Sequence, residues 1–189
     1  MLAVCLSAAV LLWAFWQKRQ RVWLAERNSA LLRELAGASS LSRLNRVYTI
    51  LSAVNHVIMH ARDRADLLDQ TCRVIAERGG FPLVWVGLGD AATGWIEPAA
   101  RAGSASAHLA AVRLSARDVP EGRGLSGRAI RENRAVIVSD LFADPDLRPG
   151  HDRARAAGVR SGAAFPLHIY GRPVGVLSIG AVEVGFFDQ

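Results

Sequence analysis

The chain has 189 residues, enough for one domain with a hydrophobic core plus appendages but not for two full domains. Hydrophobic residues make up 51% and charged residues 21%, a balance that excludes intrinsic disorder. The formal net charge of +6 does not indicate a nucleic-acid partner, because the arginines are scattered mostly singly, without a basic stripe interleaved with aromatic residues.

Residues 1–17 are predicted to be a membrane anchor. Leu2–Trp16 carries no charge, and the basic cluster Lys18–Arg21 follows it. This run is shorter than the roughly 20 residues that cross a bilayer, so either the span is thin or the chain begins within a longer membrane region. A cleaved signal peptide would carry its positive charge before the run. The positive-inside rule places the rest of the chain on the cytoplasmic side of the inner membrane.

Residues 18–40 are predicted to form a helical juxtamembrane stalk, interrupted by a hinge at 37–40, and residues 41–189 to form one sensor domain. The domain opens with a stripe whose members alternate by three and four positions: Leu41, Leu44, Tyr48, Leu51, Asn55 and Ile58. We predict that this stripe faces the domain core. The alternative is a parallel coiled coil whose register Asn55 fixes. A homodimer through the helices is the expected assembly.

The next helix is predicted over 64–78, with Gly79 and Gly80 ending it. Cys72 lies on its apolar stripe and is predicted to be a core residue rather than a nucleophile, since nothing nearby is electropositive. His56 and His60 have the spacing of a metal pair, but no third ligand accompanies them, so we predict no metal site.

Five strands follow, predicted over 81–88, 95–102, 135–138, 162–170 and 173–180. The first two and the last two form hairpins, because turn residues close each pair. Two helices before the strands and helical crossovers between them indicate an α+β domain around an antiparallel sheet.

The ordered motifs of residues 41–189 resemble the GAF domain family. They are GGF at 79–81, VWVGL at 84–88, GRGLSGRAI at 122–130, 136–140, RSGAAFPL at 160–167, GVLSI at 175–179 and GFFD at 185–188. The resemblance implies a five- or six-stranded antiparallel sheet flanked by helices. It also implies a small-molecule pocket, or an empty one, between the sheet and the crossovers. The subtype is similar to domains fused to diguanylate cyclases, cyclic-di-GMP phosphodiesterases and histidine kinases. The family's last helix and its output domain are expected to follow Gln189.

The segment Gly122–Gly127 matches a G-x-G-x-x-G fingerprint, but the polar stretch before it is not a buried strand, so a dinucleotide cofactor is not predicted. Ser126 lacks the spacing of a nucleophile elbow.

The acidic loop over 140–149 lacks the spacing of a calcium loop. A short helix over 151–158 is expected to cover the pocket.

The candidate ligand-binding residues combine apolar faces on the sheet with polar groups on the crossovers: Trp85, Arg123, Gly124, Asp140, Arg160, Ser161 and Phe165. No catalytic residue is predicted, and the sequence leaves any cofactor unknown. The expected function is a sensory input module that binds an unknown small molecule and controls an output domain. The alternative is a structural dimerisation module with an empty pocket. Methionine sulfoxide reduction would need loop cysteines, which the sequence lacks.

Overall fold

The computed structural model describes residues 44–109 and 113–188, and the fold is that of the compact unit Val47–Gln189. The predicted anchor at 1–17 and stalk at 18–40 lie outside the described residues. Among the described helices, none combines the length and the apolar character that a membrane span requires.

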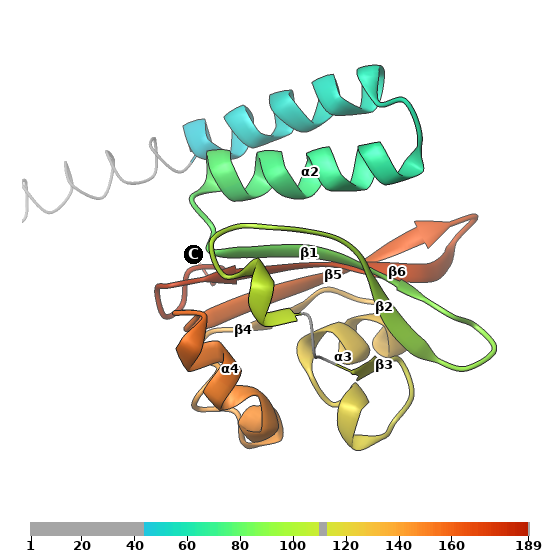
Figure 1. Cartoon of the computed structure of the whole chain (residues 1–189). Helices are drawn as coiled ribbons and strands as arrows, with labels where there is room; N and C mark the ends of the chain where they lie inside the picture. Colours follow the sequence, from blue (N-terminus) through green and yellow to red (C-terminus); the bar gives the residue numbers. More distant parts are fainter. Residues whose placement is uncertain (1–43, 110–112, 189) are drawn as a thin grey trace, which may run out of the picture. The chain divides into compact units, whose positions relative to one another are not determined.

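The centre of the domain is a six-stranded antiparallel sheet with the order β3-β2-β1-β6-β5-β4 (Figure 1). The strands are β1 (Leu83–Gly89), β2 (Trp95–Ala102), β3 (Leu114–Ser115), β4 (Val136–Val138), β5 (Ser161–Ile169) and β6 (Arg172–Ala181). The predicted α+β class and all five predicted strands are confirmed. Strand β3, which the sequence analysis missed, has only two residues, too few to produce a visible alternation.

The sheet separates two hydrophobic cores, because alternate side chains of a strand point to opposite faces. Val84 and Val86 of β1 belong to the core that also holds Cys72 and Ile75 of helix α2 (Arg64–Gly79). Trp85, between the two valines, belongs to the other core, together with Val176 of β6 and Ile130 of helix α3 (Leu125–Glu132). A strand buried on both faces reads as a continuous apolar run, which is how 83–88 reads.

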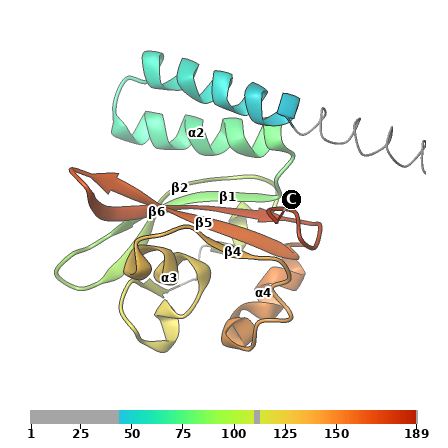
Figure 2. The ribbon, with the colours of Figure 1, turned by 180° about the vertical axis from the view of Figure 1, so that it is seen from behind.

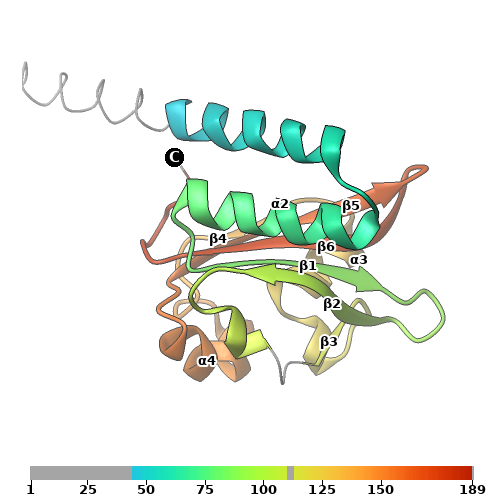
Figure 3. The ribbon, with the colours of Figure 1, turned by 45° about the horizontal axis from the view of Figure 1, so that its top comes forward.

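Two helices lie on the first side of the sheet, α2 against the strands and a second helix outside it (Figure 1). Helix α2 (Arg64–Gly79) begins at Asp63, whose carboxylate accepts a hydrogen bond from the backbone N–H of Asp66 at 2.9 Å, and ends at Gly80 in the left-handed conformation. A helix over 44–60 runs alongside α2 on the side away from the sheet (Figures 1 and 3). The predicted end of α2 at Gly79 and Gly80 is confirmed.

The predicted orientation of the helix over 44–60 is wrong. The stripe of Leu44, Tyr48, Leu51, Asn55 and Ile58 is exposed, with Leu44 67% and Tyr48 72% accessible. The core-facing stripe is instead Ile50, Val54 and Val57, and Val57 is 4% accessible. Both stripes have the three-and-four spacing of a helix face, and they lie about 110° apart around the axis. Periodicity alone could not decide which one meets the domain.

The crossover segments cover the second face (Figure 2). They contain η1 (Ser106–Leu109), η2 (Pro120–Gly122), α3 (Leu125–Glu132), η3 (Pro145–Gly150) and α4 (His151–Ala156). The predicted short helix at 151–158 is therefore present as α4, slightly shorter, and α3 is one of the predicted helical crossovers. Helix α3 packs on β5 and β6, and α4 follows η3 directly.

Candidate functional site

A cavity of about 200 Å³ lies between the second face of the sheet and the crossover segments. Most of its wall is apolar. The apolar residues include Leu83, Trp85, Leu109, Leu125, Leu141 and Leu147. The strands supply its floor, while η1, the start of α3, the end of η3 and α4 supply its sides. This is a partly open, apolar site with few polar groups, the usual composition of a small-molecule pocket.

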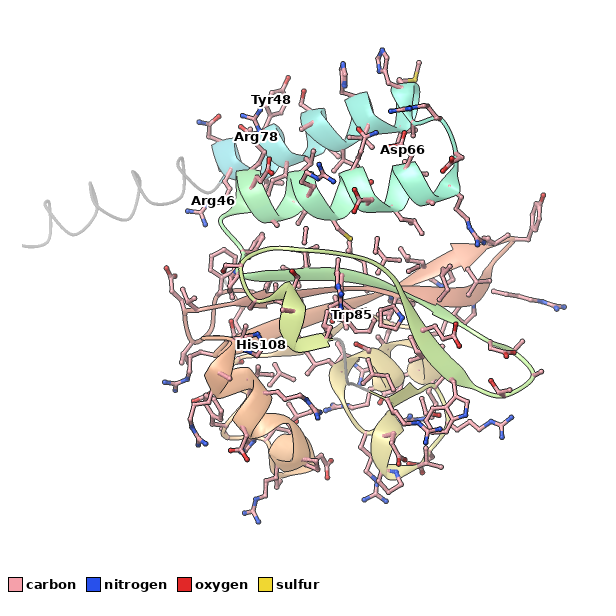
Figure 4. All side chains as sticks on the ribbon, viewed as in Figure 1. Arg46, Tyr48, Asp66, Arg78, Trp85 and His108 are labelled. Atoms are coloured by element: carbon pink, nitrogen blue, oxygen red, sulfur yellow. The ribbon has the colours of Figure 1, made fainter. Side chains whose placement is uncertain are left out.

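Trp85 lies at the centre of the sheet and presents its indole to this side (Figure 4). It is only 4% accessible. Gly87 makes room for the ring: a Cβ at Gly87 would lie 2.5 Å from Cζ3 of Trp85 and 2.5 Å from Cγ2 of Ile96. The same point is an irregularity in the β1–β2 register. The sequence Trp85-Val86-Gly87 thus positions an aromatic floor.

The glycine-rich segment 122–127 brings the start of α3 close to the cavity. A Cβ at Gly122 would lie 1.9 Å from the carbonyl oxygen of Arg117, and a Cβ at Gly127 would lie 2.3 Å from those of Gly122 and Ser115. Gly124, the N-cap of α3, has no atom within 4 Å of such a Cβ. Two of the three glycines therefore serve close backbone packing, which explains the G-x-G-x-x-G spacing without a dinucleotide.

Five polar residues line the cavity within the part of the chain that the structure describes: His108, Ser126, His151, Arg153 and Ser178. Ser126 of α3 donates to Ser178 of β6 at 3.4 Å, which ties the helix to the sheet. Nδ1 of His108 donates to the carbonyl oxygen of Ala105 at 3.2 Å, so this ring is held in place (Figure 4). Nε2 of His151 is buried and lacks a hydrogen-bond partner among the described residues.

Of the seven predicted site residues, Trp85 and Gly124 line the cavity. Asp140 and Arg160 lie together outside its wall, joined by an ion pair of 3.0 Å. The Arg160 guanidinium, and then the backbone N–H of Phe142, donate to the Asp140 carboxylate and hold its pKa below the ordinary 3.8. This pair fastens the loop after β4 to the start of β5.

The other three predicted residues point elsewhere. Ser161 is fully buried and donates to the carbonyl oxygen of Glu183 at 2.6 Å. Phe165 pairs with Leu177, which belongs to the core on the α2 side, so its ring lies on the face opposite Trp85. Arg123 is exposed at the end of η2. Side chains alternate between the two faces along β5, so Ala164 lies on the same side as Trp85 and its neighbour Phe165 on the other.

His108, His151 and Arg153 line the cavity although no sequence pattern predicted them there. His151 and Arg153 lie on the helix predicted to cover the pocket, and their spacing of two gave no motif. His108 lies on the 3-10 helix η1, for which the sequence carried no signal. Only the fold brings these three segments together.

Cys72, which the sequence placed in the core, is fully buried in α2 on the face of the sheet opposite the cavity. Burial, and secondarily the carboxylate of Asp69, raise the pKa of its thiol from the ordinary 9.0 to about 11. His56 and His60 stack on each other at 4.2 Å between ring centroids. Among the described residues, no group of three His, Cys, Asp or Glu side chains is arranged to hold a metal.

The raised pKa of Cys72 predicts a pH dependence of stability. Between pH 9 and pH 11 the unfolded chain loses the thiol proton that the folded chain keeps, so stability falls as pH rises through this window. We expect the free energy of unfolding to fall by about 2 kcal/mol more in the wild type than in Cys72→Ala over that window. Urea unfolding of both proteins at several pH values measures this, and equal pH slopes would contradict it.

The chain matches the family model described as a GAF domain over residues 61–189. No curated protein matches it significantly. Among solved structures it is similar to the free methionine-R-sulfoxide reductase of Neisseria meningitidis in complex with its substrate. That match has 26% identity and a TM-score of 0.61, and it covers 76% of this chain and 77% of the other.

Two further structures share the fold at lower identity. The A. aeolicus nlh2 GAF domain in an inactive state has 11% identity and a TM-score of 0.57, covering 73% of this chain and 80% of that one. A methyl-accepting chemotaxis protein, residues 122 to 287, has 20% identity and a TM-score of 0.53, covering 69% and 79%. With the family model matching well over half of its residues, this chain belongs to the GAF domain family.

Proposed function

We propose that this chain is the sensory input module of a bacterial-type signalling protein, and that its cavity binds a small regulatory ligand. The observation that carries this is the cavity itself. It is mostly apolar, and the buried Trp85 forms its floor. Its wall includes His151, whose buried Nε2 lacks a hydrogen-bond partner among the described residues. Similar folds occur in signalling proteins such as the chemotaxis protein above.

The chain is proposed not to be an enzyme, although one similar structure is a methionine sulfoxide reductase. Thiol chemistry needs an accessible thiolate beside the substrate. Within the described residues the cysteine is Cys72, which is buried in the core on the α2 side. The sheet therefore lies between its thiol and the cavity. Its raised pKa keeps it protonated at neutral pH.

The membrane anchor, the stalk and the output that the module controls are also proposals. Residues 1–17 anchor the chain in the inner membrane, residues 18–40 form a stalk, and residues 41–189 lie on the cytoplasmic side. The apolar run and the following basic cluster support this. The output that the module controls is proposed to be cyclic-di-GMP turnover or a histidine kinase. The support for that output is the similarity of the sequence motifs.

The second candidate function, dimerisation, is favoured by the exposed stripe on the helix over 44–60. Tyr48, Leu51 and Ile58 of this stripe are each more than half accessible. Leu51 and Ile58 occupy the d positions of a heptad and Tyr48 and Asn55 the a positions. Apolar d residues with a single polar a residue form a seam that an identical helix, parallel and in register, complements. Asn55 would then meet Asn55 of a second copy.

Thermal unfolding of the whole chain in mild detergent, with a panel of small metabolites, tests the sensor proposal. A ligand at a hundred times its Kd adds about 2.7 kcal/mol, or roughly 5–10 °C for a domain of this size. Ala154→Phe, which places a ring in the cavity from α4, is expected to remove the shift caused by a hit. A panel without hits, or hits that Ala154→Phe and Ala157→Leu both leave unchanged, would contradict the proposal.

A further inference from the structure

The charges around the cavity indicate what kind of ligand it takes. Among the described residues that line it, none is acidic, while two histidines and one arginine lie on its wall. A cationic ligand would therefore enter an apolar site without a counter-charge, which is unfavourable. An anion or a hydrogen-bond acceptor would find donors there. The ligand class is inferred from three separate features of this wall.

The first feature is His151. The ring nitrogen Nε2 of His151 is buried, and among the described residues it has no hydrogen-bond partner. Buried polar groups in folded proteins are nearly always paired, so an orphaned one calls for an explanation. The ring is held edge-on to Phe142, with 5.1 Å between centroids, and the residue lines the cavity. Because the residue borders the cavity, a small rotation of the ring would turn the buried Nε2 toward an acceptor atom of a ligand there.

The second feature is Arg153, an exposed residue of α4 two positions after His151. Within the described residues its neighbours Arg155 and Arg160 pair with Asp152 and Asp140, whereas Arg153 forms no ion pair. It lines both the cavity and an adjoining hollow. That hollow is lined by Glu121 and Asp146 as well as by Arg113, and neither acidic residue is among those that line the cavity.

The third feature is the start of α3. Gly124, Leu125 and Ser126 all lie on the cavity wall, and the N-cap Gly124 provides no side-chain hydrogen bond to the helix. The first turn of a helix carries a partial positive charge and backbone N–H donors. This end of the cavity is therefore electropositive independently of His151 and Arg153.

The size of the cavity limits the ligand. A volume of about 200 Å³ lies below the roughly 300–1,000 Å³ of pockets for drug-sized molecules. At protein packing density it holds a molecule of roughly ten non-hydrogen atoms. Trp85 and the surrounding leucines favour an aromatic or branched apolar body.

We propose that the cavity binds a small carboxylate with an aromatic or branched apolar body. The body lies against Trp85 and the leucines, and the carboxylate lies toward Nε2 of His151 and the guanidinium of Arg153. This proposal rests on the proposed function of the same cavity, which it deepens by naming the ligand class.

Three probes of nearly equal shape test the class: phenylacetate, phenylacetamide and phenethylamine, titrated by calorimetry into the whole chain. We expect phenylacetate to bind at least ten times more tightly than the amide, and the amine to bind more weakly still. His151→Leu and Arg153→Gln should each reduce the affinity for phenylacetate about tenfold while leaving that for the amide unchanged. Arg155→Gln, on the same helix but outside the cavity wall, should change neither.

Equal affinity for the acid and the amide, preference for the amine, or no binding of any probe would overturn the proposed class. So would a loss of phenylacetate binding in Arg155→Gln as large as that in Arg153→Gln. The proposed function fails separately, because it requires only that some member of the wider metabolite panel produce a shift that Ala154→Phe removes. His151→Leu is expected to fold, since it removes a buried polar atom that lacks a partner in the described structure.

Discussion

Replacing Gly127 with alanine is expected to destabilise the folded chain by about 3 kcal/mol, at the upper end of what overpacking usually costs. The new Cβ would lie 2.3 Å from the carbonyl oxygens of both Gly122 and Ser115. Both are backbone atoms, so neither can rotate away as the end of a side chain could. Urea unfolding followed by circular dichroism measures the change in the free energy of unfolding.

Gly124→Ser is the matched control for Gly127→Ala. It lies in the same segment, at a backbone φ of −66° that any residue adopts, with no atom within 4 Å of the added Cβ. Serine is also a favourable helix N-cap, so stability should stay the same or rise by a few tenths of a kcal/mol. If both variants destabilise the chain equally, close packing of Gly127 is not the reason for the motif.

Leu51→Glu is expected to weaken the proposed homodimer by at least about 100-fold, equivalent to about 2.7 kcal/mol. Leu51 occupies a d position at the middle of the exposed stripe, so the substitution would place two carboxylates opposite each other in the seam. Because Leu51 is 56% accessible in the single chain, the fold itself should lose little stability. Sedimentation equilibrium of the whole chain in density-matched detergent measures the dimer Kd.

His56→Glu is the control for Leu51→Glu, since it adds the same charge to the same helix on an exposed side away from the stripe. It should leave the dimer Kd within about threefold of the wild type, a few tenths of a kcal/mol. A wild-type chain that is monomeric at all concentrations, or equal weakening by both substitutions, would contradict a seam at Leu51.

The sequence allowed prediction of the elements whose signals are local. The hairpin turns, the glycines that end α2 and the unbroken apolar run of β1 each depend on a few neighbouring residues, and all were found. The face of the helix over 44–60 could not be predicted, because two stripes of equal periodicity compete. Which one is buried depends on where α2 lies, and that is a tertiary property.

The candidate site was predictable only in part for the same reason. Trp85 stands out as a large aromatic residue within a buried strand, and Gly124 within a motif. Phe165 was expected on the same face as Trp85, but a difference of one residue along β5 decides which face a side chain occupies. His108 and His151 lie 43 positions apart and meet only through the fold, so no spacing rule could pair them.

The central claim is that a small ligand occupies the cavity over Trp85, and the indole N–H resonance of Trp85 in a ¹H–¹⁵N spectrum reports on it directly. Trp85→Phe assigns the signal. Trp95, on β2 with the guanidinium of Arg113 over its ring at 4.2 Å, serves as an internal reference away from the cavity wall. We predict that a saturating hit from the metabolite panel shifts the Trp85 resonance and leaves that of Trp95 in place. An unchanged Trp85 resonance under saturation would contradict the account.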